Sequence, residues 1–274
     1  MPRRLALIVC VLTASTTVRG EPATRRVDLG YDTSADLFII GTGLYVSLLF
    51  QVEINPNETT SHCRWCKPPG FDAKAREAVV SDDTKTAETA GNLGAFVVAP
   101  VAALGLTSWA AAADGRSDEM WVNDLIIVEA TTTTVALTQV VKPIFGRARP
   151  AVYYDAHDWR SFPKQEVNGS FFSGHSSTSF ALAVSSGTVA SMRGYRLAPV
   201  VWGVGLPIAA LTAYSRMAAD AHYLSDVVVG SVVGAGIGFS MAYFMHSPRE
   251  RAVAWHPAVL PVPGGAAPGI GGWF

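Results

Sequence analysis

The stretch SRMAADAHYLSD, from Ser215 to Asp226, decides how this chain is interpreted. His222 follows the Ser215-Arg216 pair after five residues, and Asp226 comes four residues after His222. On a helix, a spacing of four places both side chains on one face, within reach of each other. A carboxylate that accepts a hydrogen bond from one imidazole nitrogen leaves the other nitrogen free as a nucleophile. The alternative is a helix-end cluster of solvated polar groups, and this stretch alone does not decide between the two.

Two further stretches supply what a phosphate dianion needs. KPIFGRARP places Lys142 and Arg149 with six residues between them, and FFSGHSSTSF places Ser173, Gly174 and His175 before a weakly polar run. Together they offer positive charge, a hydroxyl and the backbone N–H groups of a helix start, and the histidine could protonate a leaving oxygen. The alternatives are cations that flank a membrane helix and a serine that is only an N-cap.

The three stretches in order, K-x6-RP, SGH and SR-x5-H-x3-D, resemble the tripartite signature of the type-2 phosphatidic acid phosphatase superfamily. That superfamily also contains the vanadium haloperoxidases and the bacterial class A acid phosphatases. The resemblance covers roughly residues 90–246 and implies an all-α antiparallel helical bundle with a vanadium-haloperoxidase-like core. One departure is Phe172, where the family usually has proline; this position shapes the loop and carries no chemistry.

The resemblance also implies a role for each motif residue. Neutral His222 would attack phosphorus and form a phosphohistidine, and Asp226 would orient it. His175 would protonate the leaving oxygen and then help to activate water. No metal and no cofactor is implied, because cations would stabilise the charge of the phosphoryl group. The residues that would hold the phosphoryl oxygens are Lys142, Arg149, Ser173, Gly174 and Arg216.

The composition favours a membrane protein. Of 274 residues, 49% are hydrophobic and 16% are charged, whereas about 25% are charged in an average soluble domain. A net charge of −1 gives nucleic-acid binding no electrostatic support. Glu129, inside an apolar run, should face a bundle interior. We expect five to six mostly transmembrane helices, at residues 37–54, 92–113, 120–141, 176–192, 197–214 and 223–244.

The chain divides into four parts. Residues 1–20 resemble a secretory signal peptide, since Arg3 and Arg4 precede an apolar run from Leu5 to Leu12. Residues 21–88 form an N-terminal segment with a short apolar helix and a Cys-x-x-Cys loop, and residues 89–246 form the phosphatase bundle. The Pro/Gly-rich tail, residues 247–274, should lack regular structure. The apolar run at 37–50 has 14 residues, so whether it spans the membrane is left open.

Cys63 and Cys66 are the two cysteines that follow the predicted signal peptide. In an oxidising compartment, two nearby cysteines favour a local disulfide. Free thiols and a metal site are the alternatives, in that order. A zinc site is disfavoured because it would need about four ligands, and only His62 is an obvious neighbour.

Antiparallel helices bring all three motifs to one end of the bundle. If the N-terminus is exported and six helices cross, that end faces the cytoplasm. The basic residues Arg193, Arg196, Arg249 and Arg251 belong to the opposite end, which favours the reverse orientation. The conflict disappears if residues 37–50 do not span, or if the chain is a soluble periplasmic bundle.

We therefore expect an integral membrane protein of the bacterial cell envelope, with its active site in the periplasm. It should hydrolyse phosphate monoesters or diphosphates of lipids. The alternatives are a soluble periplasmic acid phosphatase of broad specificity and an inactive membrane scaffold of the same fold. The sequence indicates neither which lipid phosphate is the substrate nor the oligomeric state.

Overall fold

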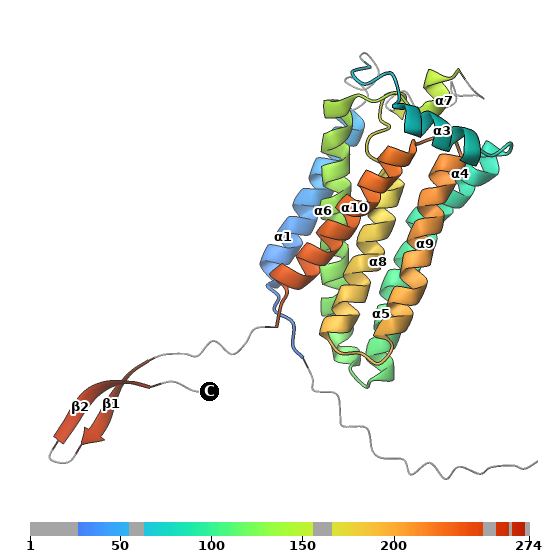
Figure 1. Ribbon diagram of the computed structural model, residues 1–274. Coiled ribbons are helices and arrows are strands. Elements are labelled where there is room, and N and C mark those ends of the chain that lie inside the picture. Colours follow the sequence, from blue (N-terminus) through green and yellow to red (C-terminus); the bar gives the residue numbers. More distant parts are fainter. Residues whose placement is uncertain (1–26, 55–62, 156–165, 249–255, 263–264, 272–274) are drawn as a thin grey trace, which may run out of the picture.

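The computed structural model describes residues 27–54, 63–155, 166–248, 256–262 and 265–271. Within these residues the chain forms one bundle of long helices that run alternately up and down, with two short helices across one end (Figure 1). The export signal predicted at residues 1–20 lies outside the described residues.

Six long helical segments make up the bundle. The first is α1 (Thr33–Leu49), which continues into η1 (Phe50–Ile54), and the second joins α4 (Thr84–Leu93), η2 (Gly94–Val98) and α5 (Ala99–Ala113). The third is α6 (Met120–Phe145), preceded by η3 (Ser117–Glu119). The last three are α8 (Gly174–Met192), α9 (Ala198–Ala218) and α10 (Leu224–Ser240), which continues into η6 (Met241–Met245). The two short helices are α3 (Gly70–Val79) and α7 (Pro150–Tyr153).

Local sequence signals set the helix ends. The Asp32 carboxylate caps α1 by accepting hydrogen bonds from the N–H groups of Ser34 and Ala35. Gly146 ends α6 in the left-handed region, with φ of 49°. Ser173 caps α8. Two of these signals lie in the motifs, so the motifs come at helix ends.

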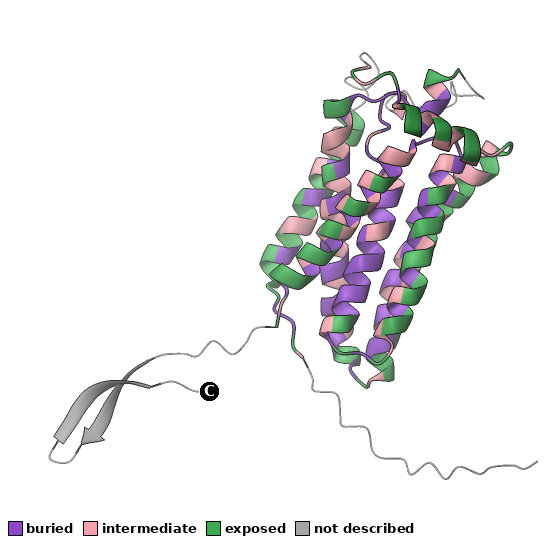
Figure 2. Ribbon diagram, in the orientation of Figure 1, coloured by how far each residue is buried: buried purple, intermediate pink, exposed green. Residues whose placement is uncertain are grey.

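The centre of the bundle is α8, which packs against α6, α9 and α10. Figure 2 shows α8 buried along most of its length, whereas the outer helices each have an exposed face. The glycines Gly230, Gly234 and Gly238 of α10 lie directly against the α8 backbone. Small residues at this spacing allow membrane helices to approach closely.

Five helical segments are long and apolar enough to cross a membrane: Thr33–Ile54, Thr84–Ala113, Ser117–Phe145, Ala198–Ala218 and Leu224–Met245. The central helix α8 is not among them. The predicted all-α antiparallel bundle of mostly transmembrane helices is thus confirmed, and the protein is an integral membrane protein.

Three features of the structure differ from the element boundaries expected from the sequence. The first helix runs for 22 residues from Thr33 to Ile54, because the Asp32 cap adds a turn before the apolar run. The expected boundary between residues 88 and 89 falls inside α4. The tail, expected to lack regular structure, forms an antiparallel hairpin of β1 (His256–Val262) and β2 (Gly265–Gly271).

Candidate active site

The three motifs meet at the end of the bundle that carries α3 and α7 (Figure 1). Motif one spans the end of α6 and the start of α7, motif two begins α8, and motif three joins α9 to α10. All predicted site residues come from these helix ends. The antiparallel order of the helices therefore brings them together.

His222 lies in the turn between α9 and α10 and is 3% exposed. Its Nδ1 lies 2.8 Å from the Ser170 carbonyl oxygen, so Nδ1 carries the proton and donates it to this bond. Its Nε2 lies 3.4 Å from Nη1 of Arg149. This tautomer, assigned from the hydrogen bonds, leaves the Nε2 lone pair directed towards the cations of the site.

Asp226 and His222 do not share a helix, as the spacing had predicted, because α10 begins only at Leu224. The Asp226 carboxylate lies 3.8 Å from His222 Nδ1. It accepts hydrogen bonds from the Tyr223 N–H at 2.9 Å and from the Ser170 hydroxyl at 2.5 Å. The carboxylate therefore fixes the segment whose carbonyl orients His222.

Three cations converge on one carboxylate, that of Glu166. The Arg149 guanidinium donates to a Glu166 carboxylate oxygen at 2.6 Å and to the Glu166 backbone oxygen at 2.7 Å. Lys142 and Arg216 also interact electrostatically with Glu166. Arg216 is 2% exposed, and its Nη1 donates to Asn92 Oδ1 at 3.2 Å.

The electrostatics around Glu166 and His222 favour anions. Arg149 above all, together with Lys142 and Arg216, lowers the pKa of Glu166 to about 2. Burial, followed by the same arginines and lysine, lowers the pKa of His222 well below its ordinary value of 6.5. The pocket therefore keeps His222 neutral and holds a negative charge beside it.

Motif two lies close to the same cations, whose charges act on His175. Ser173 is fully buried and accepts a hydrogen bond from the Ser176 hydroxyl at 2.9 Å. Gly174 begins α8, so its N–H belongs to the helix N-terminus. His175 Nε2 donates to Asn92 Oδ1 at 2.7 Å, and the His175 ring packs edge-on against Phe96.

A buried arginine that the motif reading overlooked holds Asp226 in place. Arg147 is 1% exposed, forms an ion pair with Asp226, and donates to Asp72 Oδ2 at 2.7 Å. Its guanidinium lies 3.8 Å from the Trp65 ring centroid. The position of Arg147 between Lys142 and Arg149 could have indicated that it belongs to the site, but no sequence signal pointed to Asp72. The other residues overlooked are Asn92, Glu166 and Ser170.

The Cys-x-x-Cys loop packs over motif one. Cys63 and Cys66 have their sulfur atoms 2.09 Å apart, and Trp65 lies between them in sequence. The Arg64 N–H donates to the Gly146 carbonyl at 2.9 Å. The loop thus belongs to the active end of the bundle, and the disulfide in the purified protein remains a prediction.

A membrane bundle that gathers three cations, a helix N-terminus and a neutral histidine at one end has the features of a site for phosphoryl transfer. Residues 124–250, just under half of the chain, match the family model for the PAP2 superfamily. All three motifs lie inside this stretch, and the resemblance is confirmed over it.

One solved structure resembles this chain at a distance. It is described as a crystal structure of the first transmembrane PAP2 type phosphatidylglycerolphosphate phosphatase from Bacillus subtilis. The identity is 17% and the TM-score 0.48, over 77% of this chain and 95% of that one. No curated protein matches the sequence. The family match bears on the function of this chain, whereas the structural likeness is too distant to do so.

Proposed function

We propose that this protein is a phosphatase that hydrolyses phosphate monoesters or diphosphates of lipids through a phosphohistidine intermediate. One observation carries the proposal. The Glu166 carboxylate is bound by Arg149 next to the neutral His222, and the charges of Lys142 and Arg216 act on the same carboxylate. The family match over the same residues supports it.

The arrangement suits a two-step reaction. In the first step, His222 Nε2 attacks phosphorus, the bond to the leaving oxygen breaks, and His175 gives that oxygen a proton. In the second step, water attacks phosphorus while His175 takes a proton from the water. The phosphorus–nitrogen bond breaks, its electron pair returns to His222 Nε2, and phosphate leaves. The cations stabilise the charge on the transferring oxygens throughout. Asp226 acts as a positioning residue, through Ser170.

The position of the site supports a lipid substrate. His222 lies between the apolar helices α9 and α10, and Lys142 lies in the last turn of the apolar helix α6. The hydrocarbon core of a bilayer is about 30 Å thick, so helix ends lie at the level of the headgroups. A lipid phosphate can therefore reach the cations while its acyl chains remain in the bilayer.

The experiment compares wild type with two variants of the Ser215–Asp226 stretch, in detergent, on a panel of lipid phosphates and diphosphates. His222→Ala should lose activity and acid-labile phosphate labelling. Ser215→Ala is the matched control: Ser215 is half-buried and its hydroxyl donates to the Leu211 carbonyl of its own helix, so activity should persist. More than a few per cent activity in His222→Ala would refute the covalent mechanism. A folded wild type that hydrolyses none of the substrates would favour an inactive scaffold.

We also infer that the active end faces the periplasm. The Cys63–Cys66 loop lies at this end, whereas Arg193 and Arg196 lie at the other. Thr33–Ile54 is long enough to span a membrane, and we infer that it does, which sets aside the explanation in which residues 37–50 do not span. With six crossings, the residues before α1 would lie in the cytoplasm. A signal peptide that is cleaved after residue 20 on the periplasmic side is then incompatible with an active end that faces the periplasm.

Labelling of intact cells tests the orientation. Lys74→Cys places a thiol on α3 at the active end, and Ser117→Cys places one in η3 at the opposite end; both positions are exposed. A membrane-impermeant maleimide should label the first variant only. Labelling of the second alone, together with an intact-protein mass that lacks residues 1–20, would reverse the assignment.

A further inference from the structure

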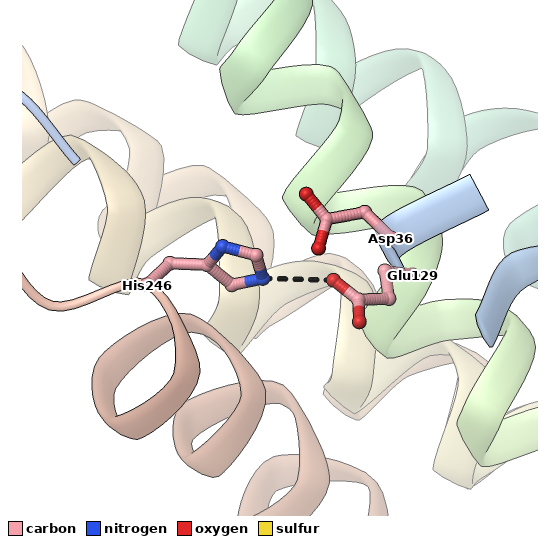
Figure 3. A group of neighbouring side chains, drawn as sticks. All are labelled: Asp36, Glu129 and His246. Carbon is pink, nitrogen blue, oxygen red and sulfur yellow. Dashed lines mark hydrogen bonds and ion pairs between the residues drawn. The ribbon is translucent and has the colours of Figure 1, made fainter. Parts of the chain in front are cut away.

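A buried cluster of ionisable side chains lies outside the active site. Asp36 belongs to the first turn of α1, Glu129 to α6, and His246 follows η6 directly. They are 5%, 0% and 2% exposed. Figure 3 shows the three side chains pointing towards one another from separate segments. The cluster sits towards the end of the bundle opposite the motifs, where α1 begins and η6 ends.

The geometry of the cluster resembles that of a coordination shell. One ligand atom from each residue can be chosen so that all three atoms lie within 4.8 Å of one another. Three ligand atoms that each lie about 2.0–2.2 Å from a tetrahedral ion are about 3.3–3.6 Å from one another. A metal ion between them would therefore need the most widely separated of these atoms to approach each other by about 1.2 Å, through side-chain rotation.

Backbone groups orient the potential ligands. His246 Nδ1 donates to the Gly30 carbonyl at 2.8 Å, which directs Nε2 at Glu129 Oε2, also 2.8 Å away. A metal-binding histidine characteristically donates its other ring N–H to a carbonyl or carboxylate in this way. Asp36 Oδ2 accepts a hydrogen bond from the Asp32 N–H at 3.1 Å.

The charges in the cluster are not balanced. Among the residues that the structure describes, Glu129 Oε1 is buried without a hydrogen-bond partner. Within the same residues, Glu129 pairs with His246 at 2.8 Å, and no ion pair joins Asp36 or Glu129 to a lysine or arginine. One histidine can offset at most one of two buried carboxylate charges, and an uncompensated buried charge is costly. A divalent cation, with His246 neutral, balances both carboxylates.

We propose that Asp36, Glu129 and His246 bind a divalent first-row transition-metal ion. One imidazole nitrogen and two carboxylates suit zinc or manganese, whereas calcium and magnesium prefer oxygen ligands alone. Three protein ligands leave at least one position for water. The ion joins the start of α1 to α6 and to the end of η6, so its role is structural. The site stands whether or not the proposed phosphatase activity is correct.

The test measures metal content and thermal stability of the full-length protein in detergent, without reference to activity. After treatment with a chelator, the protein is loaded with Zn²⁺ or Mn²⁺ and passed over a desalting column. The amount of metal that stays bound is then measured by elemental mass spectrometry. Wild type should keep about one ion per chain and unfold at a higher temperature than the unloaded protein, because the ion binds the folded state. Glu129→Gln keeps the side-chain shape but loses the charge. It should retain no more than about a tenth of the metal that wild type retains.

The matched control is Asp124→Asn, the same chemical change on the same helix at a half-buried position outside the cluster. It should bind metal as wild type does. If Glu129→Gln cannot be purified in folded form, the metal-dependent shift in wild-type melting temperature still decides. Either of two results would overturn the proposal: no retained metal and no stability shift in wild type, or equal metal binding by Glu129→Gln.

Discussion

Replacing Gly234 with alanine should force α10 away from α8. A Cβ atom at this position would lie 2.0 Å from the Ser177 carbonyl oxygen and 2.7 Å from its carbonyl carbon. Both atoms belong to the α8 backbone, so no side-chain rotation relieves the overlap. Ordinary contact begins at 3.4 Å, so one helix has to move by about 1.4 Å.

The neighbouring Gly236 provides the control. A Cβ atom there meets nothing within 4 Å. Both substitutions gain about 1 kcal/mol of helix propensity, so this gain cancels when the two variants are compared. Overpacking costs about 1–3 kcal/mol, and a backbone overlap belongs at the upper end. We expect Gly234→Ala to be about 2–3 kcal/mol less stable than Gly236→Ala.

The assay is unfolding of both variants in the same detergent, with lipid phosphatase activity measured alongside. Ser177 lies one turn beyond Ser173 on α8, so the shift should also displace motif two. A displacement of about 1 Å at reacting groups can cost about 100-fold in rate. If Gly234→Ala proves as stable and as active as Gly236→Ala, the close packing of α8 and α10 described above is incorrect.

Three further predictions concern the active end. Glu166→Gln should bind vanadate or phosphate several-fold more tightly than wild type, because a neutral amide no longer competes for the cations. Glu77→Gln, at an exposed position, is the control. Weaker binding by Glu166→Gln would mean instead that Glu166 orients Arg149 for the substrate. The pKa of His222 is lowered, so the nucleophile stays neutral as the pH falls through 6.5. The acidic limb of kcat/KM, corrected for ionisation of the substrate phosphate, should have its midpoint below this value, and a midpoint at or above it would contradict the assignment. Non-reduced peptides should show Cys63 and Cys66 joined, two hydrogens lighter than the thiols; alkylation of both in protein from the native compartment would exclude the disulfide.

The same lowered pKa affects stability. Because native His222 resists protonation, the unfolded chain binds the proton first as the pH falls below 6.5. The contribution of this histidine to stability is therefore present at neutral pH and is lost in acid. Replacing it should flatten the acid side of the stability curve.

The sequence was informative where the chemistry depends on residues close together in the chain. The motif spacings located both histidines, the three cations and the caps of the helices that carry them. The i to i+4 spacing correctly suggested that His222 and Asp226 are neighbours, but it attributed this to a shared helix, which the structure does not show. The pair spans a helix start, so a capping interaction and the Ser170 carbonyl replace the expected contact.

Residues from distant helices could not be predicted. Asp72 reaches Arg147 from α3, and Asn92 joins His175 to Arg216 from α4. These contacts depend on how the helices pack, and no spacing in the sequence encodes that packing. Glu129 shows the intermediate case: its burial was expected from the membrane environment, but its partners His246 and Asp36 became visible only in the folded chain.

The burial of α8 has a consequence for biosynthesis. A helix that enters the bilayer alone must be apolar enough to remain there, and α8, with its many serines and threonines, is not among the segments that meet this requirement. The connection from α8 to α9 is short, from Arg193 to Leu197. We expect the two helices to leave the translocon as a hairpin, with the more apolar α9 carrying its polar partner into the membrane. Truncation after α8 should then leave that helix uninserted, although every residue that it contributes to the site is present.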